Sequence, residues 1–315
     1  MKSTSHMACS KEASAPADRR KTRASASILR NSFGVFERLV GVLRHRKSGA
    51  NPMAADLTKF EKFFIPSSEA DARLEIVAAK PRHEGPYPTI VFNHGSTGRG
   101  HNKSLYTRTV SPAVVANYFV ERGWMILFPQ RRGRGKSGGH YGEGLAPDCS
   151  GYSCNIDIAI AGFERAVEDV DAVVRHLRAR SDVDQSRLVI AGVSRGGILS
   201  IAYAGMRPAT FRGAVNFNGG WLGRGCASHE IVNPAIFERG APAGISTLWL
   251  HGSHDQYYRI EHCRGNFERF LSAGGQGKFV AAAAGHALMF KPALWKNHLD
   301  HYIDSVAKGT SPQSL

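Results

Sequence analysis

Short apolar runs alternate with amphipathic stretches along most of the chain after residue 58. Partly alternating apolar residues at 59–65 and 73–79 predict an N-terminal hairpin with a turn between them. Short runs made mostly of apolar residues follow, and the unbroken run at 188–193 is typical of a strand buried on both faces. These runs lie at residues 89–93, 124–129, 188–193, 213–216, 247–250 and 278–282. The pattern predicts a sheet of about eight strands.

Stretches with helical spacing separate the later runs. The clearest covers residues 157–180, where apolar residues recur at intervals of three and four on one face. The other predicted helices cover residues 111–123, 197–205, 259–273 and 292–307. Strands that alternate with helices in this way predict an α/β fold, with a mostly parallel sheet covered by helices on both faces.

A serine lies where the run at 188–193 meets the helix at 197–205. The sequence Gly192-Val193-Ser194-Arg195-Gly196 fits G-x-S-x-G, the turn that exposes a nucleophilic serine between a strand and a helix. Glycine at the two outer positions removes Cβ atoms that would collide in so tight a turn. We therefore predict that Ser194 is a nucleophile, whereas the alternative makes it a helix N-cap between ordinary turn glycines.

An acid and a base follow two later strands. Asp255 comes shortly after the run at 247–250, and His286 after the run at 278–282. Ligand sites in such sheets lie at the carboxyl ends of the strands, and the order Ser, Asp, His is that of α/β-hydrolases. We expect His286 to take the proton of Ser194 and Asp255 to orient His286.

The developing oxyanion of an acyl transfer needs two backbone N–H donors. One is expected from Arg195, directly after the nucleophile. The other is expected from Ser96, in the loop after the run at 89–93. His94 precedes this loop, and we expect it to shape the loop rather than to act as the base.

No metal and no cofactor are predicted. His251, His254 and Asp255 are close in sequence, but ligands so close together in a tight loop seldom converge on one ion. The glycine-rich loop at 130–139 does not have the spacing of a Walker phosphate loop.

The cysteines do not fix a disulfide framework. Their number is five, and no C-x-x-C occurs. Cys149 with Cys154, and Cys226 with Cys263, are possible pairs, but free thiols are the default expectation.

These motifs resemble the α/β-hydrolase superfamily, specifically its dienelactone-hydrolase-like and prolyl-oligopeptidase-like esterase branch. The resemblance rests on residues 192–197, His94-Gly95, residues 251–255 and Gly285-His286, and it extends over residues 57–308. The loop at 132–139 is similar to the branch's R-G-x-G-x-S-x-G element. The resemblance implies an α/β-hydrolase fold and a serine hydrolase that cleaves a small-molecule carboxylic ester. True dienelactone hydrolases carry a cysteine where this chain has Ser194, so dienelactone is not the expected substrate.

Arg132 and Trp221 are the candidate substrate-binding residues. Arg132, like its neighbours Arg131 and Arg134, can attract an anionic acyl group, whereas the alternative for these arginines is a solvated loop or structural ion pairs. Trp221 is the first residue of a segment at 221–240 for which the pattern predicts no helix or strand. Together with residues 141–154, this segment can cover a pocket.

Two other functions fit the same scaffold. A serine peptidase or an acyltransferase would use the same three residues, because the triad sets the chemistry and the pocket sets the acceptor. From a different class, a non-catalytic binding protein can have an α/β-hydrolase fold, although such a scaffold usually lacks a triad residue.

The net charge of +15 is concentrated near the N-terminus, since residues 1–50 hold eleven Lys or Arg against three acids. We expect residues 1–52 to be a disordered basic extension and 53–315 to form the hydrolase domain, although a targeting segment or a misplaced start before Met53 also fits. The charge therefore predicts no nucleic-acid partner. No stretch approaches the roughly 20 apolar residues of a membrane span, so a cytoplasmic location is expected. The oligomeric state is not predicted.

Overall fold

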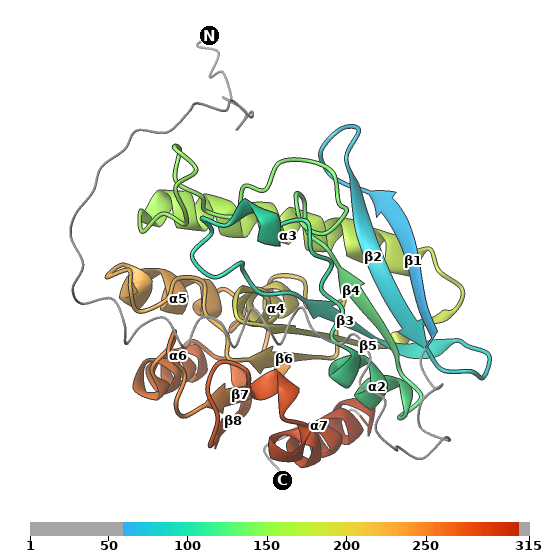
Figure 1. Cartoon of the computed structure of the whole chain (residues 1–315). Coiled ribbons are helices and arrows are strands. Elements are labelled where there is room, and N and C mark those ends of the chain that lie inside the picture. The colour runs from blue at the N-terminus through green and yellow to red at the C-terminus, as the bar shows by residue number, and fades with distance from the viewer. Residues whose placement is uncertain (1–58, 309–315) are drawn as a thin grey trace, which may run out of the picture. The chain divides into compact units, whose positions relative to one another are not determined.

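The computed structural model describes residues 59–308, and a single sheet of eight strands runs through them (Figure 1). The strand order is β1-β2-β4-β3-β5-β6-β7-β8. All neighbours from β4 through β3 to β8 run parallel, while β2 is antiparallel to both β1 and β4. The strands are β1 (Lys59–Pro66), β2 (Arg73–Lys80), β3 (Tyr87–Asn93), β4 (Met125–Pro129), β5 (Val183–Val193), β6 (Gly213–Phe217), β7 (Ser246–Gly252) and β8 (Gln276–Ala282). The predicted α/β-hydrolase fold is confirmed. The predicted extension at 1–52 lies outside the described residues.

Helices cover both faces of the sheet (Figure 1). The helices α3, α4, α5 and α6 pack on one face, and their apolar residues form one core with that side of the strands. The helices α2 and α7 form a second core on the opposite face. The helices are α2 (Ala113–Val120), α3 (Ile156–Arg178), α4 (Arg195–Met206), α5 (His229–Glu238), α6 (Ile260–Ser272) and α7 (Lys296–Lys308), with short 3-10 turns η1 (Lys103–Leu105), η2 (Leu288–Phe290) and η3 (Pro292–Leu294).

The central strands are buried on both faces, which explains why their sequences are mostly apolar. Every residue of β3, β4 and β6 is buried. A side chain within such a strand has only the core to contact, so polar groups that meet a ligand must follow the strand. Because β5, β6, β7 and β8 are successive parallel neighbours, the segments after them meet at one edge of the sheet.

Three elements differ from the sequence-based expectation. The helix α5 lies in the segment 221–240, where no helix was predicted; Pro234 lies inside it and weakens the helical signal. The predicted helix at 292–307 is divided into η3 and α7. The strand β5 begins at Val183 rather than at residue 188, because polar residues at its start extend it beyond the apolar run.

A disulfide joins Cys154, just before α3, to Cys226, just before α5. The expectation of free thiols is therefore wrong for these two residues, and so are the considered pairs Cys149–Cys154 and Cys226–Cys263. Cys263 is a buried free thiol. Sequence spacing could not identify this bond, because its partners are 72 residues apart and meet only through the packing of α3 and α5. Disulfides are rare in the reducing cytosol, so the bond weighs against the expected cytoplasmic location.

Removing this disulfide should lower the stability of the fold. Cys226→Ser removes a cross-link between residues 72 positions apart. By chain entropy alone, such a cross-link contributes about 4 kcal/mol to the free energy of unfolding, and measured contributions are typically about 2–4 kcal/mol. We expect the melting temperature to fall by about 5–12 °C in a calorimetric scan. The double variant Cys154→Ser/Cys226→Ser should match Cys226→Ser, because both lack the same bond. A melting temperature equal to that of the wild type would contradict a structural role for the bond.

Within the described residues, no helix combines the length and apolarity needed to cross a bilayer.

Candidate active site

Ser194 occupies a strained turn between β5 and α4. Its backbone has φ 57° and ψ −124°, a conformation that residues with a Cβ atom rarely adopt. The N–H of Ser194 donates to the carbonyl of Phe217 at 2.9 Å, and its own carbonyl accepts from Gly197 at 2.9 Å. These bonds to the next strand and the next helix hold the serine in this geometry at the carboxyl end of β5.

Glycine at 192 and 196 lets this turn lie against the end of β3. A Cβ atom on Gly196 would lie 2.0 Å from the carbonyl oxygen of Asn93, and one on Gly192 would lie 2.3 Å from the carbonyl oxygen of Gly196. These contacts involve backbone atoms, which cannot rotate away. The two glycines therefore let the turn at Ser194 contact the loop after β3, which is expected to hold the oxyanion.

His286 and Asp255 form a buried pair. The Nδ1 atom of His286 lies 2.7 Å from Oδ2 of Asp255, and both side chains are almost inaccessible to solvent. The other carboxylate oxygen accepts the N–H groups of Tyr257 at 2.7 Å and Tyr258 at 3.2 Å. Burial opposes the ionisation of Asp255, but the bond from His286 and these N–H groups outweigh it, so the pKa of Asp255 lies below its ordinary value. A carboxylate at this position assigns the proton of His286 to Nδ1 and leaves Nε2 as the acceptor.

Tyr258 connects the pair of His286 and Asp255 to Ser194. No motif in the sequence pointed to this tyrosine. Its hydroxyl donates to the carbonyl of Gly220 at 2.7 Å and is also a hydrogen-bond partner of Ser194. Its ring centroid lies 5.6 Å from that of His286. Tyr258 therefore contacts both Ser194 and His286, which places the three predicted residues in one site.

Asn218 is a second residue that the sequence analysis missed. Its amide nitrogen donates to Oδ2 of Asp255 at 2.7 Å and to the carbonyl of Gly285 at 3.1 Å, and its amide oxygen accepts from Gly252 at 3.2 Å. It ties together the loops that follow β6, β7 and β8. The signal was a polar residue directly after a buried strand, the same signal that identified Asp255.

Asn218→Gly should lower kcat/KM by about tenfold or more, because it removes a hydrogen bond to a buried carboxylate. Glycine suits the left-handed backbone of this residue, φ 48°, so the variant isolates the lost bonds from backbone strain. Ester hydrolysis by the folded variant measures the effect, with active-site titration to count competent molecules. Asn218→Asp keeps the size but places a second carboxylate beside Asp255, and it should be at least as damaging. A kcat/KM within threefold of the wild type in both variants would show that Asn218 does not position the pair.

His94 is a neutral residue that fixes the loop after β3. Burial, followed by the charges of Arg131 and Arg134, holds the pKa of His94 well below its ordinary value. Its Nδ1 lies 2.8 Å from the carbonyl oxygen of Gly95, and its Nε2 lies 3.1 Å from the backbone nitrogen of Arg131. The proton is therefore on Nδ1, where it is donated to Gly95, and Nε2 accepts.

The candidate oxyanion donors flank the serine. A Cβ atom on Gly95 would lie 3.0 Å from Cβ of Ser194 and 3.6 Å from its Oγ, so the loop that carries Ser96 lies against the nucleophile. Arg195 is the first residue of α4. Among the hydrogen bonds of residues 59–308, none uses the N–H of Ser96 or of Arg195. Both donors are therefore available to an oxygen atom beside Ser194.

The two candidate substrate-binding side chains lie in packed surroundings. Nε of Arg132 lies 2.5 Å from Asp169, and its Nη2 lies 2.7 Å from Glu168. This is the structural ion pairing considered as the alternative for Arg132. Trp221 is buried, with its ring 5.6 Å from that of Phe163 in an edge-to-face contact. Arg132 is therefore held by two acids, and Trp221 by core packing.

His251 is a buried residue near the end of β7 that packs against aromatic rings. Burial lowers the pKa of His251 to about 3, and its ring stacks on Phe279 at 5.1 Å. Residues 59–308 contain no group of three or more His, Cys, Asp or Glu side chains arranged to hold a metal ion.

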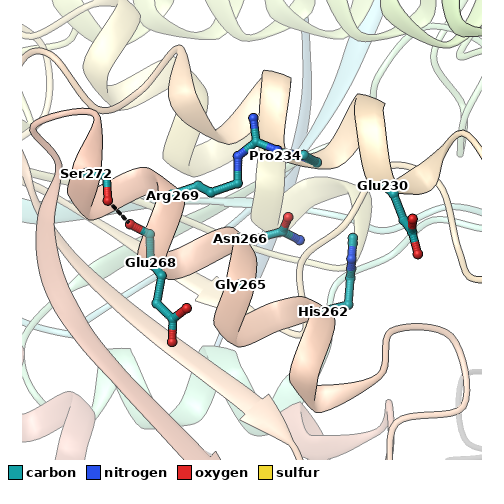
Figure 2. A pocket seen from close by; sticks show the side chains of 8 residues that line it. All are labelled: Glu230, Pro234, His262, Gly265, Asn266, Glu268, Arg269 and Ser272. Atoms are coloured by element: carbon teal, nitrogen blue, oxygen red, sulfur yellow. Dashed lines mark hydrogen bonds between the residues drawn. The ribbon is translucent and has the colours of Figure 1, made fainter.

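A surface pocket of about 350 Å³ lies between α5 and α6 (Figure 2). Its polar lining includes Glu230, His262 and Arg269. Neither the predicted triad nor Trp221 lines this pocket, so it is a separate feature of the surface.

Known proteins match both the sequence and the structure. Residues 162–234 match the prolyl oligopeptidase family. Over 145 residues the chain is 28% identical to a probable carboxylesterase from Oryza sativa subsp. japonica, and this match covers 44% of the chain and 52% of the relative. An esterase from Pyrococcus furiosus superposes with a TM-score of 0.56 at 15% identity, over 83% of this chain and 95% of that one. An acylaminoacyl peptidase from Pyrococcus horikoshii gives 0.54 at 14% identity, over 79% of this chain and 41% of that one.

The fold of the chain is the α/β-hydrolase fold, as its likeness to these solved structures shows. In sequence, the chain is similar to the prolyl oligopeptidase family over residues 162–234 and to a carboxylesterase, in line with the resemblance noted from its motifs. The matched region spans about half the length of the rice relative.

Proposed function

We propose that the protein is a serine hydrolase that cleaves carboxylic esters of small molecules. The observation that carries the proposal is the strained turn at Ser194 beside the buried pair of His286 and Asp255, whose Nδ1 and Oδ2 atoms lie 2.7 Å apart. Strain of this kind is retained where the surrounding structure fixes it, and it is characteristic of functional sites.

The proposed reaction has two steps, each with a tetrahedral intermediate. Oγ of Ser194 attacks the acyl carbon while Nε2 of His286 takes its proton, and the N–H groups of Ser96 and Arg195 bind the oxyanion. The intermediate collapses, and His286 returns the proton to the departing alcohol. Water then attacks the acyl-serine, with His286 again as base, and the carboxylic acid leaves. Asp255 stabilises the cationic form of His286 in both steps, and no cofactor takes part.

A serine peptidase is the second candidate. The observation in its favour is the match of residues 162–234 to the prolyl oligopeptidase family. The ester assignment is supported by the carboxylesterase relative and by the esterase that superposes over 95% of its own length. Comparison of an N-acyl amino acid methyl ester with the corresponding p-nitroanilide would separate the two.

A fluorophosphonate probe tests the proposal directly. We expect the full chain to hydrolyse p-nitrophenyl butyrate and to lose this activity in proportion to labelling, with one probe per chain on the peptide that contains Ser194. A folded protein that neither turns over the ester nor reacts with the probe would overturn the proposal and favour a non-catalytic binding protein.

A further inference from the structure

Four arginine side chains are buried near the candidate oxyanion loop, and they differ in their partners. Arg131 forms an ion pair with Glu143, and Arg132 forms one with Asp169. Arg134 and Arg195 are each only 2% exposed. Even so, no carboxylate of residues 59–308 lies within 4.0 Å of either guanidinium group, the distance limit for an ion pair.

Arg134 uses little of its hydrogen-bonding capacity. Its Nη1 donates to the carbonyl oxygen of Gly95 at 3.2 Å, and its guanidinium carbon lies 5.4 Å from the ring centre of Tyr141. Its Nε is buried and has no hydrogen-bond partner. A buried donor without a partner is unfavourable unless a ligand supplies an acceptor.

Arg195 is held rigidly by neutral groups. Its Nε donates to the carbonyl of Trp221 at 2.9 Å, and its Nη1 donates to the carbonyl of Glu143. The guanidinium carbon lies 3.7 Å from the ring centre of Tyr152 and 4.8 Å from that of Trp221. These aromatic faces and carbonyl oxygens solvate the cation only in part.

The acids closest to this region are already engaged. Glu143 pairs with Arg131, and its carboxylate also interacts electrostatically with Arg195 and Arg134. Asp255 holds His286, and Glu75 accepts the backbone N–H of Lys136 and the hydroxyl of Thr109. One carboxylate therefore faces three arginines, and neither Arg134 nor Arg195 has an ion-pair partner of its own among the described residues.

Both arginines lie beside the nucleophile. Arg195 follows Ser194 in the chain, and the carbonyl that Arg134 binds belongs to Gly95, whose backbone touches Ser194. The carbonyl of a bound ester must lie at the N–H groups of Ser96 and Arg195, so the acyl chain attached to it starts close to these guanidinium groups. A carboxylate on that chain would gain charge-assisted hydrogen bonds in a site shielded from water.

We propose that the preferred substrates are esters whose acyl chain ends in a carboxylate, and that Arg134 and Arg195 bind this carboxylate. The inference rests on the proposed ester hydrolysis and narrows its substrate class.

A matched pair of esters tests the preference in the wild-type protein. Monomethyl glutarate and methyl pentanoate differ only in that the first ends in a carboxylate and the second in a methyl group. The release of acid from each ester is measured by pH-stat titration. We expect kcat/KM for monomethyl glutarate to exceed that for methyl pentanoate by about tenfold or more.

Variants assign the preference to the arginines. Arg134→Gln should reduce the ratio of the two kcat/KM values by about tenfold, and Arg134→Lys, which keeps the charge but not the planar fork, should restore part of it. Arg195→Gln should also reduce the ratio. Arg187→Gln is the charge-matched control, because Arg187 is half-exposed, pairs with Asp184 and lies toward the opposite end of β5; its ratio should equal that of the wild type.

The outcomes separate this inference from the function on which it rests. Turnover of methyl pentanoate with a wild-type ratio of one or less would overturn the carboxylate site and leave the ester hydrolase intact. An equal loss of ratio in Arg187→Gln would overturn the assignment to Arg134 and Arg195. Turnover of neither ester, nor of p-nitrophenyl butyrate, would overturn the proposed function and this inference with it. The wild-type ratio requires no variant, so the test survives if Arg134→Gln fails to fold.

Discussion

Ser194→Ala should lower kcat for p-nitrophenyl butyrate by about 10⁶-fold, which leaves only residual acceleration by the oxyanion donors and substrate binding. The variant removes one oxygen atom and keeps the Cβ atom, so the backbone contacts of the turn remain. The bonds from Ser194 to Phe217 and from Gly197 to Ser194 involve main-chain atoms and are unaffected. The loss should therefore be chemical rather than structural, and the melting temperature should stay near that of the wild type.

Ser194→Gly provides the control for backbone strain. At φ 57° and ψ −124° a glycine lacks the Cβ atom that makes this conformation unfavourable. We expect this variant to be as inactive as Ser194→Ala yet more stable by about 1 kcal/mol, since the strain relieved exceeds the entropy that glycine adds to the unfolded chain. Chemical denaturation with matched m-values measures the difference. Activity above about 1% of the wild type in both variants would exclude Ser194 as the nucleophile.

The strand pattern could be predicted from the sequence because buried parallel strands consist mostly of apolar residues. The runs around Ile90, Ile126 and Ile190 had no polar interruptions, and each became a central strand. Ser194, Asp255 and His286 could be proposed because each follows such a strand, and because the G-x-S-x-G motif and the order Ser, Asp, His accompany them. The start of β5 could not be seen, because its exposed polar residues carry no apolar period.

Contacts between segments that are distant in the chain could not be predicted from the sequence. The bond between Cys154 and Cys226 depends on how α3 and α5 pack, and α5 itself was hidden by Pro234. Likewise, Arg131, Arg132 and Arg134 are adjacent in sequence and looked equivalent, yet their partners are Glu143, Asp169 and a main-chain carbonyl. The partner of a loop side chain depends on the direction in which that side chain points. The periodicity of apolar residues predicts helices and strands but not this direction.

Asp255→Asn should lower kcat by about 10⁴-fold through the tautomer of His286. In the variant, the amide oxygen must remain at the position of Oδ1, where it accepts the N–H groups of Tyr257 and Tyr258. The amide nitrogen then takes the position of Oδ2 and faces Nδ1 of His286 as a donor. His286 can satisfy it only by moving its proton to Nε2, where it can no longer accept the proton of Ser194.

Asn218 favours the opposite amide orientation, in which the amide oxygen takes the position of Oδ2, and it gives the experiment its control. Its amide nitrogen already donates to Oδ2 of Asp255, and it cannot rotate without losing its bonds to Gly252 and Gly285. The double variant Asp255→Asn/Asn218→Gly should therefore be at least as inactive as Asp255→Asn, because it lacks the donor that favours an amide oxygen at the position of Oδ2 and the proton of His286 on Nδ1. Hydrolysis of p-nitrophenyl butyrate at pH 8, with melting temperatures for both variants, measures this. If Asp255→Asn retained more than about a tenth of wild-type kcat, Asp255 would not be the residue that sets the tautomer of His286.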